Sequence, residues 1–189
     1  ALILVGSGTY GSINVDKPIT VQSTNGPQST VIDGTNSTRC AYLADASTLI
    51  GFTLTRGKVV GVGGGAYCEG SGVVISNCVI AGNTAQYGIG DESGYGGGVY
   101  RGTLYNCVIT SNSATTLGYG GGAYGSTLYN CLISDNVSAW DGGGTEGGTL
   151  YNCLLIGNSA KNGGGAAYGT LYSCTLTGNS ASQSGGGIL

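Results

Sequence analysis

The sequence predicts a β-solenoid, a chain that coils so that equivalent short strands stack on one another. The stretch GGTLYNCLLIGNSA, which begins at Gly147, nearly recurs as RGTLYNCVITSNSA, GSTLYNCLISDNVSA and YGTLYSCTLTGNSA, and a run of glycines follows each copy. The repeated residues are strand formers such as Val, Ile, Thr and Tyr, interrupted by Gly and Asn, without the spacing of an amphipathic helix. Such self-similarity is typical of a solenoid in which each unit covers its neighbour's hydrophobic face.

The composition of the 189 residues excludes several classes of protein. The 40 glycines occur in clusters and not at every third position, which excludes collagen, and 40% hydrophobic residues can fill a core. The net charge of −3 provides no basic surface for nucleic acid, and no apolar run reaches the roughly 20 residues of a membrane span. The chain starts without Met and ends as another repeat begins, so we expect a piece of a longer or processed polypeptide.

The repeats align on the leucine of TLYNC, and these leucines predict an inward-facing row of a strand. The equivalent positions lie 21 to 29 residues apart, at Leu49, Ile75, Leu104, Leu128, Leu150 and Leu171. Two residues later stands a residue that tolerates a left-handed backbone, which predicts a turn. These turn positions are Gly51, Asn77, Asn106, Asn130, Asn152 and Ser173. We expect one β-helix domain over residues 1–189, with less regular coils over 1–48 and repeats over 49–189.

Cysteine occupies the position after the turn in most repeats, and the earliest readable repeat has Phe52 there. A zinc site needs several converging ligands, and Phe cannot replace one of them. In-register parallel strands hold equivalent Cβ atoms about 4.7–4.9 Å apart, whereas a disulfide needs about 3.8 Å. We therefore expect buried free thiols, with disulfides and a metal site as the alternatives. The ladder comprises Cys78, Cys107, Cys131, Cys153 and Cys174.

A second ladder consists of asparagines, which we expect to bond both the turn backbone and the asparagine of the next coil. Its members are Asn83, Asn112, Asn136, Asn158 and Asn179. The glycine runs that follow are expected at sharp bends where no Cβ fits. Insertions leave from this corner; the longest covers residues 86–95, and its acidic pair, Asp91 and Glu92, is a weak indication of a calcium-binding turn.

Two rows of tyrosines are the candidate ligand or partner surfaces, because flat amphipathic rings suit sugars and protein surfaces alike. The alternative is that stacked tyrosines only stabilise neighbouring strands. One row holds Tyr105, Tyr129, Tyr151 and Tyr172, and the other holds Tyr42, Tyr67, Tyr100 and Tyr124. Threonine is too irregularly spaced to predict a flat ice-binding array.

No set of residues predicts catalysis. Lyases of a β-helix architecture need a carboxylate cluster and a basic residue, and hydrolases need paired carboxylates at a defined separation. The nine acidic residues are scattered and the chain has no His. The best set is interpreted as solvated surface charge, so we expect neither an enzyme nor a cofactor. Its members are Asp33, Arg39, Asp45, Arg56 and Lys58.

Several segments carry a family resemblance. The segments IAGNTA with GGGVY, ITSNSA with GGGAY, ISDNVSA with GGGT and LTGNSA with GGGIL resemble the FxxN and GGAI repeats of polymorphic outer-membrane proteins and related autotransporter passengers. The opening ILVGSGTYGSINVDKPITVQSTNGPQSTVIDG is similar to the first coils of many pectin-lyase-like β-helix proteins. The resemblance implies a secreted or surface-displayed, right-handed parallel β-helix of about seven coils, roughly 33 Å long.

We therefore expect a non-catalytic extracellular or cell-surface module, structural or adhesive, that forms a segment of a stalk, a passenger or a self-stacking fibre. The alternative is a carbohydrate-binding or polysaccharide-degrading protein of the pectin-lyase-like class. The expected partners are a further copy of the chain or a neighbouring domain, stacked end to end, with carbohydrate as a further partner. The apolar first and last residues, Ala1–Val5 and Ile188–Leu189, favour such stacking.

Overall fold

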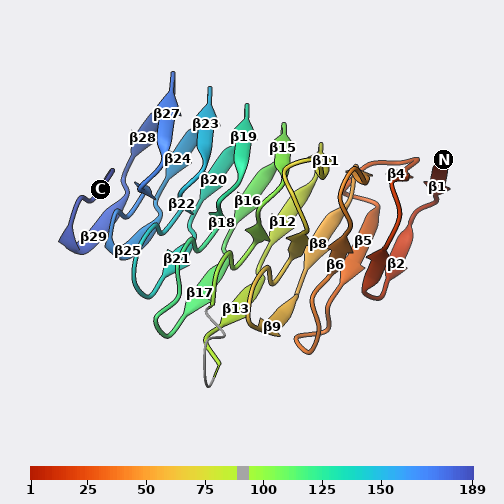
Figure 1. Ribbon diagram of the computed structural model, residues 1–189, viewed down its shortest axis with the longest axis horizontal. Coiled ribbons are helices and arrows are strands. Elements are labelled where there is room, and N and C mark those ends of the chain that lie inside the picture. Colours follow the sequence, from red (N-terminus) through yellow and green to blue (C-terminus); the bar gives the residue numbers. More distant parts are fainter. Residues whose placement is uncertain (89–93) are drawn as a thin grey trace.

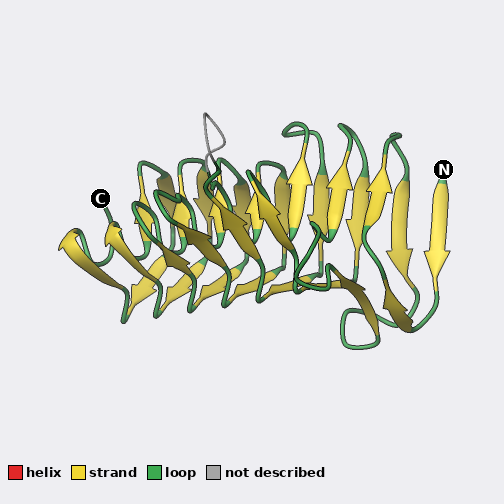
Figure 2. Cartoon of the chain, turned by 90° about the horizontal axis from the view of Figure 1, so that it is seen from below, coloured by secondary structure: helices red, strands yellow, loops and turns green. Residues whose placement is uncertain are grey.

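The computed structural model describes residues 1–88 and 94–189, and these residues form strands and turns but no helix. The strands stack in parallel along one axis, with the ends of the chain at opposite ends of the stack (Figures 1 and 2). The prediction of an all-β parallel β-solenoid of about seven coils is confirmed. The acidic pair Asp91 and Glu92 lies outside the described residues. Within the described ranges, no segment forms a helix of the length and apolar character that a membrane crossing needs.

Two sheets of eight strands carry the TLYNC motif. Sheet A consists of β1 (Leu2–Val5), β4 (Thr20–Ser23), β7 (Thr48–Ile50), β11 (Val74–Ser76), β15 (Thr103–Tyr105), β19 (Thr127–Tyr129), β23 (Thr149–Tyr151) and β27 (Thr170–Tyr172). Sheet B consists of β2 (Gly8–Tyr10), β5 (Thr30–Asp33), β8 (Thr53–Thr55), β12 (Val79–Ala81), β16 (Val108–Thr110), β20 (Leu132–Ser134), β24 (Leu154–Ile156) and β28 (Thr175–Thr177).

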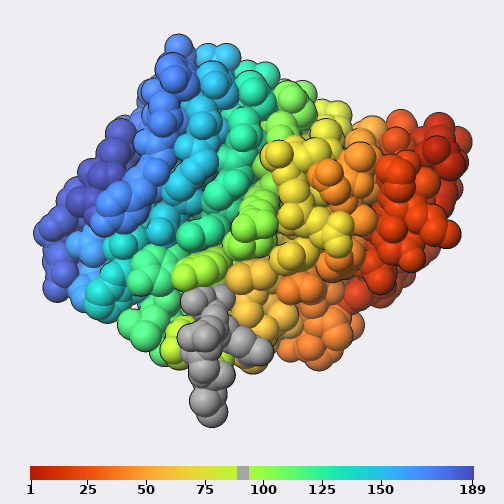
Figure 3. Space-filling view, viewed as in Figure 1, coloured from red at the N-terminus to blue at the C-terminus, as the bar shows by residue number. Residues whose placement is uncertain are grey.

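Two smaller sheets close each coil. Sheet C consists of seven strands, β3 (Ile13–Val15), β6 (Ala41–Leu43), β10 (Ala66–Cys68), β14 (Val99–Tyr100), β18 (Ala123–Tyr124), β22 (Thr145–Glu146) and β26 (Ala166–Ala167). Sheet D consists of six strands, β9 (Lys58–Val60), β13 (Thr84–Gln86), β17 (Ser113–Thr115), β21 (Val137–Ser138), β25 (Ser159–Asn162) and β29 (Ser180–Ser184). The coils follow one another as bands across the surface (Figure 3).

Aliphatic rows from sheets A and B form the centre of the core. Ile75 pairs with Leu49 on one side and Leu104 on the other, and Ile80 pairs with Ile109; all five side chains are fully buried. Successive strand residues point to opposite faces, so every second residue of a strand reaches the same interior. Equivalent leucines and isoleucines therefore stack along the solenoid, as the alignment predicts.

The turn between sheets A and B has the left-handed backbone predicted from its residue types. The φ angle is 78° at Gly51 and between 52° and 53° at Asn77, Asn106, Asn130, Asn152 and Ser173. The residue that follows points inward. Cys78, Cys107, Cys131 and Cys153 are at most 2% exposed and Cys174 is partly buried. All seven cysteines of the chain are free thiols in the structure.

The asparagine ladder satisfies its own buried polar groups. The Nδ2 of Asn112 donates to Oδ1 of Asn136 at 3.0 Å and to the carbonyl of Ile80 at 2.9 Å, and the backbone N–H of Asn112 donates to the same Oδ1 at 3.0 Å. Asn83, Asn136 and Asn158 repeat this pattern with the next asparagine of the ladder. The ladder thus links adjacent coils and leaves no amide unpaired, as buried polar groups require.

The glycine runs turn the chain from sheet D to sheet C where neighbouring backbones touch. A Cβ on Gly97 would lie 2.4 Å from the carbonyl oxygen of Ser113 and 2.5 Å from that of Gly121. A Cβ on Gly121 would meet the equivalent atoms of Val137 and Gly143 at 2.4 and 2.5 Å. These distances admit no side chain, so the coils can stack this closely only with glycine here.

Candidate functional site

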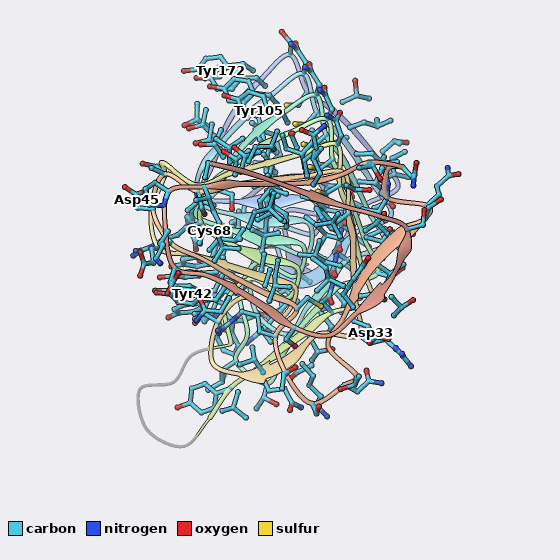
Figure 4. The ribbon with its side chains drawn as sticks, turned by 90° about the vertical axis from the view of Figure 1, so that its right-hand side faces the viewer. Asp33, Tyr42, Asp45, Cys68, Tyr105 and Tyr172 are labelled. Atoms are coloured by element: carbon cyan, nitrogen blue, oxygen red, sulfur yellow. The ribbon has the colours of Figure 1, made fainter. Side chains whose placement is uncertain are left out.

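The first tyrosine ladder stands on the outer face of sheet A. Strand pairing sets Tyr105, Tyr129, Tyr151 and Tyr172 side by side. Their ring centroids are 4.8, 4.8 and 4.9 Å apart and the rings lie within 5–9° of parallel. This spacing equals the distance between strands, so the register itself imposes the stack. The labelled rings at its two ends project from the outside of the solenoid (Figure 4).

The second tyrosine ladder stands on sheet C. Tyr42, Tyr67, Tyr100 and Tyr124 are stacked with centroids 5.3, 5.5 and 5.6 Å apart. Two guanidinium groups cap its rings: Arg39 lies 5.1 Å from the centroid of Tyr67, and Arg101 lies 4.9 Å from that of Tyr100. These cation–π contacts hold the charges against the aromatic surface.

The stacking determines what these ladders can bind. In the sheet A ladder each inner ring covers the faces of its neighbours, so a ligand meets ring edges and phenol hydroxyls. In the sheet C ladder the guanidinium groups of Arg39 and Arg101 occupy the ring surface that the stack leaves open at Tyr67 and Tyr100. A sugar that stacks needs a free ring face. The interior of both ladders therefore favours a stabilising role or an edge-on protein contact over face-on sugar binding.

The register also reveals a threonine column, which corrects the expectation that threonine is irregularly placed. Sheet A pairs Thr20 with Thr48, and Thr103, Thr127, Thr149 and Thr170 with one another, beside the tyrosine ladder. Val74 interrupts the column at β11. The sequence contained a sign of this column, because each TLY motif begins with Thr. The repeats differ in length, however, so the threonines are unevenly spaced along the chain although they are aligned in the sheet. One column beside bulky rings does not make a flat two-dimensional array.

Of the five early charged residues, the structure pairs one acid with one base but does not gather all five in one place. Arg56 forms an ion pair with Asp33, and this pairing lowers the pKa of the carboxyl group. Arg39 donates to the carbonyls of Gly63 and Val62 at 2.8 and 2.6 Å.

Lys58 and Arg39 line a hollow of about 440 Å³ beside β9. Asp45 lies at a different corner from Asp33 (Figure 4) and accepts a hydrogen bond from the N–H of Gly72. Apart from the ion pair of Asp33 with Arg56, the geometry thus brings no acid and base of this set face to face.

The thiols are poorly suited to chemistry. Burial raises the pKa of Cys40 to about 12 and that of Cys78 to about 11, and it also raises the pKa of Cys68. The thiolate is the nucleophile and the metal ligand, so these groups are inert near neutral pH. Within the described ranges, no three His, Cys, Asp or Glu side chains gather where they could hold a metal ion.

Comparison with known proteins supports the β-helix fold and the family resemblance of one repeat. A family model described as the Chlamydia polymorphic membrane protein repeat matches residues 173–189, so the resemblance to that repeat is confirmed there. No curated protein matches the chain.

Among solved structures, the chain is similar to a pectin methylesterase from carrot, with a TM-score of 0.53 and 12% identity over 100% of this chain and 78% of that one. A pectin methyl esterase from rice weevil gives a TM-score of 0.49 and 12% identity over 94% and 81%. At this identity, the likeness to the carrot protein shows the parallel β-helix fold alone.

Proposed function

We propose that this chain is a non-catalytic structural or adhesive module of an extracellular or cell-surface protein. The repeat match over residues 173–189 and the parallel β-helix support this assignment. The observation that carries it is the tyrosine ladder of sheet A, which keeps the same residue, register and ring orientation over four successive coils. A repeated row of aromatic edges and hydroxyls suits a long protein contact better than a single catalytic pocket.

The adhesive part is tested with beads coated with the purified chain and counted on a layer of cultured cells. The double variant Tyr129→Ser and Tyr151→Ser should reduce the number of bound beads, because it removes the middle of the ladder. The matched control changes Tyr67 and Tyr100 to Ser on sheet C, which also removes two stacked rings. Equal adhesion of all three proteins, or none above uncoated beads, would reject an adhesive role for sheet A.

We propose further that a coil of another copy, or of a neighbouring domain, stacks on the terminal strands. A strand edge presents unpaired backbone groups to a further strand, and head-to-tail contacts of this kind propagate without closing. In the last coil, Ile188 is 51% exposed beside the edge of sheet C. Light scattering should show association that rises with concentration and is reduced by Ile188→Asp. A strictly monomeric wild-type chain at high concentration would reject stacking between copies.

The alternative function is action on a polysaccharide such as pectin, and it rests on the fold shared with the carrot methylesterase. Fold alone does not carry function. We expect no methanol release from methyl-esterified pectin and no unsaturated products from pectate, with or without Ca²⁺. Product release that disappears on changing Arg39 or Arg56 would replace the structural proposal with an enzymatic one.

A further inference from the structure

A group of tyrosines and carboxylates gathers where the second tyrosine ladder ends. In sheet C, Tyr124 pairs with Glu146, so a carboxylate takes the next place in the row. The residues just before the glycine runs form a neighbouring row, in which Tyr95 pairs with Tyr119 and the carbonyl of Asp141 accepts a hydrogen bond from Gly120. A carboxylate therefore follows a tyrosine in both rows. We call Tyr95, Tyr119, Tyr124, Asp141 and Glu146 the tyrosine–carboxylate cluster.

The rings of this cluster form a corner instead of a simple stack. Tyr95 is stacked on Tyr124, with centroids 4.4 Å apart and an angle of 9° between the planes. Tyr119 is inclined by 65° to Tyr95, with centroids 5.4 Å apart. The face of an aromatic ring carries negative potential, so the ring face that Tyr119 does not turn toward Tyr95 favours a cation.

In the part of the chain that the structure describes, no cationic side chain pairs with the carboxylates of the cluster. Asp141 is only 6% exposed, and its Oδ1 accepts a hydrogen bond from the neutral amide of Asn162 at 2.8 Å. The Oε2 of Glu146 is buried and accepts no hydrogen bond from any described residue. Burial, and then the charge of Asp141, raise the pKa of Glu146 to about 8. A buried carboxyl oxygen without a donor is costly, and a ligand that donates to it removes that cost.

Among the described residues, no cation forms an ion pair with the carboxylates of the cluster, although Arg101 lies near enough to Tyr124 to act on its phenol. Between residues 95 and 168, the only cationic residues are Arg101 and Lys161. The guanidinium of Arg101 lies over Tyr100, and the Nζ of Lys161 lies 3.3 Å from the ring centroid of Trp140. Ala167 follows Glu146 in the row, so a methyl group stands where the preceding coils carry long side chains. The cluster therefore holds two acidic groups without a cationic side chain bonded to them, and it is bordered by a small residue in the next coil.

We propose that the tyrosine–carboxylate cluster is a binding site for a primary ammonium group of a ligand, held against the tyrosine rings and donating N–H to the two carboxylates. A primary ammonium carries three donors, which the two carboxylates can accept once the partly buried side chain of Glu146 turns its unpartnered oxygen toward the ligand. A quaternary ammonium would reach the rings but could not donate. The two sources of such a group that suit a surface module are an amino sugar and a lysine side chain. This site goes beyond the proposed structural role and does not depend on it.

Titration of the isotope-labelled chain with glucosamine, and separately with Nα-acetyl-lysine methylamide, tests the proposal by NMR. We expect the ring signals of Tyr119 and Tyr124 to shift and the titration midpoint of the Glu146 carboxyl carbon to fall on binding. With Nα-acetyl-lysine methylamide, whose ammonium stays charged across this range, affinity should rise as the pH passes through the pKa of Glu146, because the ionised carboxylate attracts the ammonium. The amine of glucosamine loses its own proton in the same range, so that probe is used below it. The titratable groups around it are Asp141 and the phenols of Tyr95, Tyr119 and Tyr124, and burial raises the phenol pKa of both Tyr119 and Tyr124.

Two variants and one further ligand make the test decisive. Glu146→Gln should weaken binding about tenfold or more, because it removes the charge-assisted bond. Glu69→Gln is the matched control, since Glu69 also meets a tyrosine hydroxyl of sheet C but is exposed and already partnered. Binding of either probe that is lost only in Glu146→Gln supports the site, and the probe that binds identifies the source. Absent shifts with both probes, unchanged binding in Glu146→Gln, or equal binding of choline would overturn it.

Discussion

The turn residue between sheets A and B shows how far residue chemistry alone predicts the structure. Gly and Asn at one repeat position predicted a left-handed backbone, and the φ angles agree. The turn between sheets B and D is also left-handed: glycine occupies it in three coils, but Arg56, Ser111 and Asp135 occupy it in three others with φ between 53° and 55°. Arg and Ser give no signal of positive φ, so the neighbouring coils and not local preference hold Arg56 and Ser111 there.

Asn130 tests this turn directly, because its φ is 53°. Asn130→Val should lower the free energy of unfolding by about 1–3 kcal/mol more than Asn130→Gly, since a β-branched residue is strained in this region. Urea denaturation of both variants measures the difference. Equal midpoints for the Val and Gly variants would place the left-handed turn elsewhere.

Glu146 predicts how stability depends on pH. Its pKa is raised from 4.5 to about 8, so between these values the folded state holds a proton that the unfolded state has lost. The free energy of unfolding should therefore fall as the pH rises from 4.5 to about 8, and this contribution should change no further above that range. Glu146→Gln should flatten the dependence in urea titrations across this window. A slope unchanged by the substitution would show that Glu146 is not the group responsible.

At the scale of elements, the ladders were predictable where the repeat keeps a constant spacing within one coil. The Leu, Cys and Asn rows follow each other at fixed intervals from TLYNC, so the alignment predicted which of them share a row. The tyrosine–carboxylate cluster was not found in this way. Tyr95, Tyr119 and Asp141 precede the glycine runs after segments of variable length, and only the strand register sets them beside sheet C.

The asparagine ladder is the element whose disruption should cost most. Asn136→Ala removes the acceptor of two bonds from Asn112 and the donor to the carbonyl of Ile109. We expect the free energy of unfolding to fall by about 3 kcal/mol or more, because each buried group left unpaired costs about 1–3 kcal/mol. Asn25→Ala is the control, since its Nδ2 bonds only to exposed Ser7, and should stay within about 0.5 kcal/mol. A similar decrease in the free energy of unfolding in both variants would show that the ladder stabilises the fold no more than an exposed asparagine does.

At the scale of the whole molecule, stability comes from the repetition of one contact set along the axis. Each coil buries its aliphatic row and its thiol against the equivalent residues of the next coil, as in other repeat proteins where neighbouring units stabilise each other. The composition and the repeat predicted this architecture, because a solenoid needs only local strand chemistry and a period. The identity of a binding partner could not be predicted in the same way, because the residues that point outward can vary without changing the fold.

Thiol titration tests the central claim that cysteines stack as buried free thiols inside an in-register parallel solenoid. The chain has seven cysteines, six of them buried and Cys174 partly exposed. In the folded chain, only Cys174 should react readily with a thiol reagent; after denaturation without reductant, all seven should react. Disulfide-linked masses, or rapid reaction of several thiols in the folded chain, would contradict the arrangement described here.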